Sequence, residues 1–203
     1  MPDIIITHGL ADEHREQAAA LYYQAFQQKL GPIFRSDEKA LDVLRASLDP
    51  NYAIVALHGG NLAGLAGFKD GNGNFVDIQP EVMTHTFGWP GGWVRLLGLA
   101  LFYRGFTDGV LLMDGIVVDA AMRGKGTGTL LLDAIIQYAA DNGYAHVRLD
   151  VVDTNPRARQ LYERKGFVAV EEQTYPLTKR FFGFSGSTTM LRQVQSSGTV
   201  DDI

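Results

Sequence analysis

The sequence predicts a mixed domain of the α/β (α+β) class, and three neighbouring stretches indicate it. Residues 110–118 form a β-branched apolar run, which is typical of a buried strand. A glycine-rich loop follows at 123–129 and leads into a helical repeat that ends before Gly143. Residues 145–152 then alternate apolar and polar side chains, as a strand does. Strands that alternate with helices in this way build a sheet covered by helices.

The other elements follow from apolar spacing and from turn residues. The Gly-Pro pair at 31–32 is expected to stop the first helix, because proline lacks an amide hydrogen. Ser36 is expected to cap the second helix, and residues 59–61 have the composition of a hairpin turn. Strands are predicted at 4–8, 52–58, 62–68, 166–172 and 187–193, and helices at 11–29, 36–48 and from 156 onward.

An insertion of about 40 residues, 69–109, separates two of the predicted strands. It begins with a turn at 69–74 and continues through a part, 75–88, that is predicted to be irregular. A strongly apolar helix is predicted to open at Trp89 and to run to Tyr103. Three placements are open for its apolar surface: against the sheet, over a ligand pocket, or in a dimer or membrane-surface contact.

The composition limits the class of protein. The 203 residues are 46% hydrophobic and 20% charged, which is ordinary for a globular chain. A net charge of −5 argues against a nucleic-acid partner, which needs a basic surface. No cysteine is present, so disulfides, thiolate nucleophiles and cysteine metal sites are excluded. The sequence has neither a signal-peptide pattern nor a run of 18 apolar residues, so we expect no membrane span and a cytoplasmic location.

The glycine loop carries the strongest functional signal. Its glycines let the backbone approach a ligand, and the first amides of the next helix lack intrahelical partners, so phosphate is a natural ligand. The spacing does not fit a dinucleotide loop, and Lys125 is not followed by the Ser or Thr of a Walker A loop. The pattern Arg-x-x-Gly-x-Gly, formed by Arg123, Gly126 and Gly128, is a third interpretation, and a turn that binds nothing is a fourth.

A second motif follows about 30 residues later. Residues 155–167 read Asn-x-x-Ala-x-x-x-Tyr-x-x-x-Gly-Phe, with Asn155 at the expected helix start and Tyr162 within the helix. Both motifs, in this order and with a strand between them, closely resemble the GNAT superfamily of acyl-CoA-dependent N-acetyltransferases. The resemblance is specific over residues 110–170 and only architectural outside them.

The resemblance implies a GNAT fold over residues 1–194, with 195–203 as a flexible tail. This fold has a central mixed, mostly antiparallel sheet of six to seven strands, splayed between strands 4 and 5 and flanked by four to five helices. Its members usually join strands 3 and 4 by a short hairpin, from which the insertion departs. The resemblance also implies that acetyl-CoA binds Ile116, Val117, Val118, Arg123, Gly124, Lys125, Gly126, Thr127, Gly128, Thr129, Asn155 and Tyr162, with no metal.

Two catalytic residues are implied. Tyr162 is the candidate acid for the thiolate leaving group, because a phenol stays protonated near pH 7. Asp114 lies where many members place a glutamate, and by strand alternation its side chain should share a face with Ile116 and Val118. Both also have ordinary structural explanations, a packing aromatic and a paired strand carboxylate. His85 and Asp77 are less favoured candidates for the base.

The expected activity is transfer of an acetyl group from acetyl-CoA to a primary amine of a small molecule or peptide. Direct attack in a ternary complex is expected, because no cysteine can carry the acyl group. An inactive acyl-CoA sensor and an NAD- or nucleotide-binding enzyme are the alternatives, and a homodimer is left open. The segments expected to choose the acceptor are 30–34, 75–103 and 175–184, and they match no motif.

Overall fold

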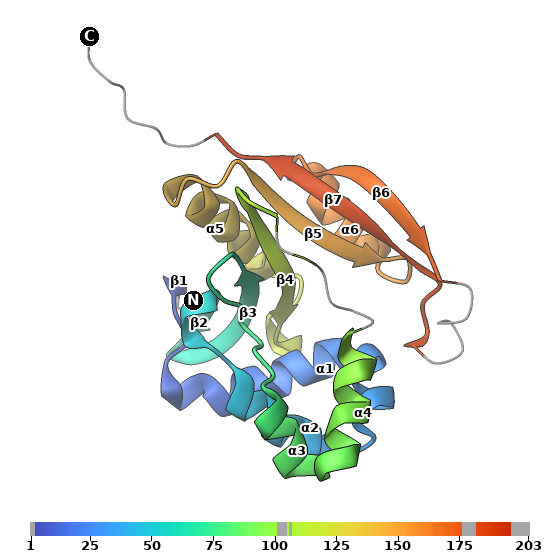
Figure 1. The fold of residues 1–203 in the computed structure, drawn as a ribbon. Helices are drawn as coiled ribbons and strands as arrows, with labels where there is room; N and C mark the ends of the chain where they lie inside the picture. The colour runs from blue at the N-terminus through green and yellow to red at the C-terminus, as the bar shows by residue number, and fades with distance from the viewer. Residues whose placement is uncertain (1–2, 101–104, 106, 176–181, 196–203) are drawn as a thin grey trace.

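The computed structural model describes residues 3–100, 105, 107–175 and 182–195, and this part of the chain forms a seven-stranded sheet with helices on both faces (Figure 1). The strand order is β1-β2-β3-β4-β5-β7-β6, and β4–β5 is the parallel pair in an otherwise antiparallel sheet. The predicted mixed sheet is therefore confirmed. The strands are β1 Ile4–His8, β2 Ala53–His58, β3 Asn61–Lys69, β4 Val110–Val118, β5 His146–Val152, β6 Val168–Thr174 and β7 Gly186–Gln193.

The helices divide between the two faces of the sheet. Helices α5 and α6 lie on one side and α1 to α4 on the other (Figure 1). The described part contains six α-helices, more than the four to five expected, because the insertion supplies two of them. They are α1 Arg15–Phe34, α2 Asp37–Ser47, α3 Pro80–Phe87, α4 Trp89–Ala100, α5 Thr127–Asp141 and α6 Pro156–Arg164.

Each face of the sheet has its own buried core. On the α5 side, Leu131 and Ile135 pack with Leu149 of β5, and all three are at most 1% exposed. On the α1 side, Phe34 and Leu44 join Leu65 of β3 and are fully buried. Burial on both faces explains why β3 and β4 read as nearly continuous apolar runs.

Helix α1 runs five residues past its predicted end at position 29. Pro32 lies inside the helix, and Arg35 ends it in a left-handed conformation, with its amide donating to the Gly31 carbonyl. The extension brings Phe34 into the core, where its ring stacks on Phe87 at 5.9 Å. Burial of an aromatic side chain therefore outweighs the hydrogen bond that proline removes.

The insertion is more ordered than predicted. Val76 pairs with Leu48 in an antiparallel bridge, and the Asp77 amide donates to the Ser47 carbonyl at 2.8 Å. Residues 80–87 then form α3 instead of an irregular segment, with Pro80 at the first helical position. The predicted apolar helix is present as α4, and residues 101–103 of that prediction lie outside the described residues.

Helix α4 packs mainly on α3 and α1. A side chain on Gly92 would come within 2.8 Å of Thr84, so glycine lets the two helices touch closely. Leu96 and Leu99 pack against the α1-side core. The opposite face of α4 is exposed and carries Trp89, Trp93, Val94 and Leu97.

Strands β4 and β5 separate halfway along their length. They pair from Val110–His146 to Met113–Leu149, and pairing ends there. At the same level the register between β3 and β4 shifts, because Gly67 faces Gly115 while Phe68 faces Met113, which leaves Asp114 as the extra residue of a bulge. The splay expected of the fold is therefore present, and a bulge accompanies it.

The two glycines paired at this bulge make room for aromatic rings. A Cβ on Gly67 would lie 2.7 Å from the Phe75 ring, and a Cβ on Gly115 would lie 2.5 Å from the Phe26 ring. Both contacts are shorter than side chains tolerate, so each ring rests directly on backbone. The paired glycines thus join α1 and the insertion to the centre of the sheet.

Gly67→Ala is expected to destabilise the fold by about 1–3 kcal/mol, because the new methyl group overpacks the site against the fully buried Phe75. Gly31→Ala is the matched control, since its Cβ would find Gln27 at 3.8 Å in the interior of α1. The control should be neutral or stabilising by up to about 1 kcal/mol. Urea unfolding measures both, and equal stabilities of the two variants would contradict the packing argument.

Candidate active site

The glycine loop turns the chain from β4 into α5. Gly124 and Gly126 have φ values of 77° and 87°, a left-handed backbone that glycine adopts without strain. The amides of Thr129 and Leu130 donate to the Gly126 carbonyl and begin the helical ladder. The amides just before them belong to the unpaired first turn of α5, where an anion is favoured. Thr127 is 1% exposed and its hydroxyl donates to the Met122 carbonyl at 3.3 Å, which fixes the turn.

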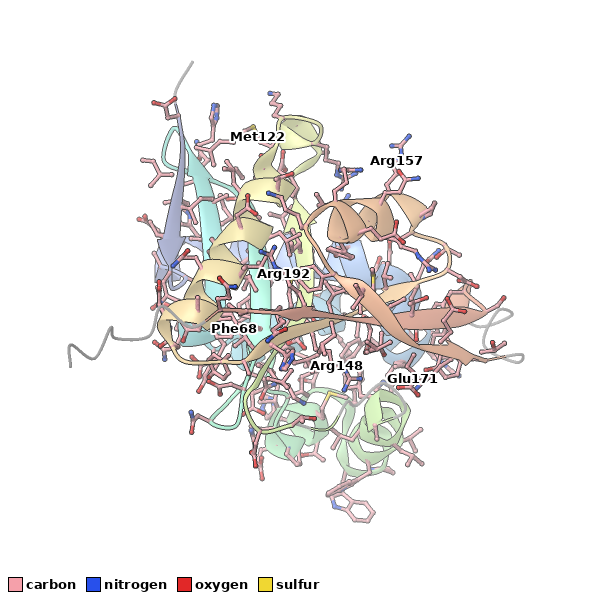
Figure 2. The ribbon with its side chains drawn as sticks, turned by 90° about the horizontal axis from the view of Figure 1, so that it is seen from above. Phe68, Met122, Arg148, Arg157, Glu171 and Arg192 are labelled. Atoms are coloured by element: carbon pink, nitrogen blue, oxygen red, sulfur yellow. The ribbon has the colours of Figure 1, made fainter. Side chains whose placement is uncertain are left out.

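The two cations of the loop have different surroundings. The guanidinium Nε of Arg123 donates to the Val118 carbonyl at 3.2 Å, so this side chain returns to the end of β4. Lys125 is exposed, and its Nζ lies 3.9 Å from the Met122 sulfur. Figure 2 shows Met122, just before α5, and Arg157, in the first turn of α6, toward the same end of the molecule. The two helices therefore begin at one end.

The free edge of β4 adjoins this loop. The Asp119 amide donates to the Ala63 carbonyl at 2.9 Å, so the backbone at 119 points to the β3 side. In an antiparallel pair the backbone N–H and C=O groups of successive residues point to opposite edges of the strand. Those of Val117 therefore point toward β3, and those of Ile116 and Val118 point toward the gap that opens beyond Met113. Of the three strand residues expected to contact a ligand, Ile116 and Val118 thus present backbone groups to the gap, and Val117 presents none.

A cavity of about 930 Å³ opens on the α1 side of the same gap. Its walls come from α1, the insertion, β4, β5 and the segment before β7. All three segments expected to choose the acceptor contribute within the described residues: Leu30 from the first, Val76, Asp77, Ile78, Leu99 and Ala100 from the second, and Tyr175, Phe182 and Phe184 from the third. Residues 176–181 and 101–103 of those segments lie outside the described part.

Asp114 is a half-buried carboxylate in this cavity. Burial raises its pKa to about 6, against the opposing charges of Lys69 and Lys29. Desolvation therefore outweighs the attraction of two cations, and the carboxylate changes charge close to neutral pH. A carboxylate with such a pKa can accept a proton reversibly near pH 7.

The predicted orientation of Asp114 is wrong. Ile116 and Val118 pack against the α5-side core, whereas Asp114 lines the cavity on the α1 side. The bulge is the reason, because the extra residue breaks the alternation and places positions 114 and 115 on one face. Alternation alone gave the opposite face.

Tyr162 lies on the other face of the sheet. It belongs to the α5-side core, is 8% exposed, and its ring lies 6.0 Å from that of Phe167. Burial raises the pKa of Tyr162 to about 12. Asn155 caps α6, with its side-chain oxygen accepting from the Ala158 amide at 3.2 Å, which leaves the carboxamide NH₂ for a ligand. Tyr162 is not among the described residues that line the cavity with Asp114.

The two less favoured base candidates differ in position. His85 is exposed on α3 and is not among the described lining residues of the cavity. Asp77 lines the cavity and accepts a hydrogen bond from the Gln79 side chain. Within the described ranges, no group of three His, Asp or Glu side chains is arranged to hold a metal ion.

Sequence reasoning missed several polar residues of the cavity, among them Tyr22, Lys29 and Lys69. Tyr22 and Lys29 lie seven positions apart on α1, so they share one face of that helix. Apolar residues such as Leu21, Ala25 and Phe26 repeat at the same helical spacing, so the sequence indicates a buried stripe here and gives no signal of a cavity wall.

Comparison with known proteins identifies the family. The model of the acetyltransferase (GNAT) family matches residues 12–167, well over half of the chain. The chain therefore belongs to the acetyltransferase (GNAT) family. The resemblance inferred from the two motifs is confirmed.

Individual relatives are more distant. The uncharacterized N-acetyltransferase YobR of Bacillus subtilis is 33% identical over 72 residues, which are 36% of this chain and 29% of that relative. An N-acetyltransferase structure from Staphylococcus aureus Mu50 superposes with a TM-score of 0.67 at 16% identity, covering 93% of this chain and 100% of the other. A structure described as an acetyltransferase gives 0.62 at 22% identity, covering 94% and 100%. These structures support the fold.

In the part of the chain that the structure describes, every helix is too short or too polar to cross a membrane.

Asp114→Asn is expected to stabilise the protein more at pH 8 than at pH 4. The pKa of the Asp114 carboxyl is about 6 in the folded protein, above the ordinary 3.8, so folding favours the protonated form. This contribution to stability is complete below about pH 4 and is lost as the pH rises through 6. The gain from the substitution should therefore grow by about 1–3 kcal/mol between the two pH values. Denaturant unfolding at both values measures it.

Asp42→Asn is the matched control, because that carboxylate pairs with Arg45 at the surface of α2. Its effect should change by less than about 0.5 kcal/mol over the same range. If the Asp114 and Asp42 variants respond alike, the carboxylate in the cavity is not desolvated.

Proposed function

We propose that this protein transfers an acetyl group from acetyl-CoA to a primary amine of a small molecule or peptide, by direct attack in a ternary complex. The observation that carries the proposal is the gap between β4 and β5. The glycine loop lies at one end of this gap, and the cavity with Asp114 opens from its side. Family membership supports the reaction class.

The residues around the gap fit the donor. The glycine loop at 124–126 and the start of α5 at Thr127 and Gly128 suit a diphosphate, because amides at a helix start favour an anion and Lys125 lies in the same loop. The backbone groups of Ile116 and Val118 at the free edge of β4 suit the amide groups of a pantetheine arm. The carboxamide NH₂ of Asn155 is a further donor at the start of α6.

The reaction requires a base that takes the proton from the amine nitrogen and a donor that stabilises negative charge on the thioester oxygen. The amine nitrogen attacks the thioester carbon, the C–N bond forms, the C–S bond breaks, and sulfur leaves as a thiolate that is finally protonated. Asp114 receives the proton from nitrogen, because its pKa of about 6 keeps it charged at neutral pH. The amide of Ile116 or Val118 would stabilise the negative oxygen of the intermediate.

Tyr162 then acts mainly as a hydrogen-bond donor. Its pKa of about 12 lies above the ordinary thiol value of about 8.5, so complete transfer of its proton to sulfur would cost about 5 kcal/mol. A charge-assisted hydrogen bond from the phenol to the developing thiolate is favourable without that transfer. The proton that ends on sulfur would come from the attacking nitrogen through Asp114 and solvent.

Two other functions give different outcomes in simple experiments. An acyl-CoA sensor of the same fold would bind the donor and acetylate no amine. An NAD- or nucleotide-binding enzyme would be stabilised thermally by NAD and not by CoA. The cytoplasmic location and the homodimer remain predictions.

Gly126→Ala is expected to weaken CoA binding about tenfold or more, because the residue has a φ of 87° and a side chain there distorts the phosphate loop. Gly143→Ala is the matched control, since Gly143 has a φ of 75° at the other end of α5 and equally open surroundings. Both variants should lose similar stability, and only the first should lose affinity. Calorimetric titration with CoA measures the affinity of each variant. Equal losses of affinity in both variants would show that CoA does not bind at the glycine loop.

Tyr162→Phe is expected to lower kcat about 100-fold with little change in the Kd for acetyl-CoA, because only the transition state carries charge on sulfur. The phenyl ring keeps its packing against Phe167, so the melting temperature should hold. Release of free thiol in an amine screen measures the rate. If the wild-type protein binds acetyl-CoA and no amine is ever acetylated, the sensor function is favoured.

A further inference from the structure

An aromatic cluster borders the cavity beside Asp114. The ring of Tyr22 lies 4.5 Å from that of Phe26 and 5.8 Å from that of Phe75, one from the same helix and one from the insertion. Tyr22 lines the cavity, and its two partners pack in the α1-side core. Its ring is thus held from two directions, and its hydroxyl is the polar group of the cluster.

The bulge of β4 holds this cluster and Asp114 in one arrangement. Phe26 and Phe75 rest on Gly115 and Gly67, the paired glycines next to the extra residue of the bulge. The bulge also turns Asp114 to the face on which these rings lie. One backbone irregularity therefore sets both the direction of the carboxylate and the support of Tyr22.

We propose that Tyr22 is a positioning residue for Asp114: its hydroxyl, on the wall of the same cavity, reaches the carboxylate through one bridging water, and so keeps it charged and aimed at the acceptor nitrogen. The proposal rests on the proposed acetyl transfer, in which Asp114 receives the proton. Burial and the negative charge of Asp114 both raise the pKa of Tyr22, so its hydroxyl stays protonated and able to donate.

Other charged groups lie around Asp114, and the variant used in the test leaves all of them in place. Lys29 from α1 and Lys69 from β3 lower its pKa, which burial raises. The same cavity is also lined by carboxylates from β5 and from the insertion and by a second phenol: Asp70, Asp77, Asp150 and Tyr175. Removing one hydroxyl changes none of these charges.

The test is Tyr22→Phe, which removes the hydroxyl and keeps the ring between Phe26 and Phe75. Loss of a donor to the charged carboxylate should raise the acid-limb pKa of kcat/KM by about 0.5–1 unit. At pH 6 the rate should then fall about two- to fivefold, with the loss disappearing above pH 8. A purely structural role would lower the rate equally at every pH.

Tyr23→Phe is the matched control, since Tyr23 is the next residue of α1 and its hydroxyl donates to Asp37 at 2.5 Å, outside the cavity. It should leave the acid limb in place. Carboxyl ¹³C NMR of aspartate-labelled protein titrates Asp114 directly and requires no turnover, with Asp114→Asn assigning the signal. An unchanged Asp114 pKa in Tyr22→Phe overturns the proposal, whereas failure of acetyl transfer in the wild-type protein counts against the proposed function alone.

Discussion

The parting of β4 and β5 is the constraint on which the rest of the structure depends. The two strands pair as far as Met113 and Leu149, and the bulge at Asp114 then turns β4 aside. In a closed sheet the backbone groups of Ile116 and Val118 would bond to a neighbouring strand. The separation leaves the Ile116 groups and the Val118 amide without a strand partner on that side, while the Val118 carbonyl accepts from Arg123. It also connects the two faces of a sheet whose cores are otherwise independent.

Each face supplies one half of the proposed reaction. The α5 face is built by residues 110–167 and carries the glycine loop, Asn155 and Tyr162. The α1 face is built by the N-terminal helices and the insertion, and it carries the cavity with Asp114. The two environments move the pKa values in useful directions: the carboxyl titrates at about 6, near neutral pH, and the phenol at about 12 remains a donor.

The sequence was sufficient where local chemistry determines structure. The bounds of β4 at 110–118, the cap at Asn155 and the order of elements around both motifs agree with prediction, because β-branched runs, glycines and caps act over a few residues. The sequence was insufficient where the structure depends on contacts between residues that are far apart in the chain. The end of α1 depends on Phe34 reaching Phe87, and the direction of Asp114 depends on register with β3. Neither partner is near in the chain.

The insertion explains why the motifs do not reveal the acceptor. Its first turn forms part of the cavity wall, and Asp70 organises that turn by accepting from the Asn72 and Gly73 amides. The same carboxylate accepts a hydrogen bond at 2.7 Å from the hydroxyl of Tyr144, which lies between α5 and β5. The cavity wall is thus hydrogen-bonded to the turn that follows α5, far along the helix from the glycine loop. This wall therefore depends on contacts between segments far apart in the chain, and neither motif contains the residues that make them.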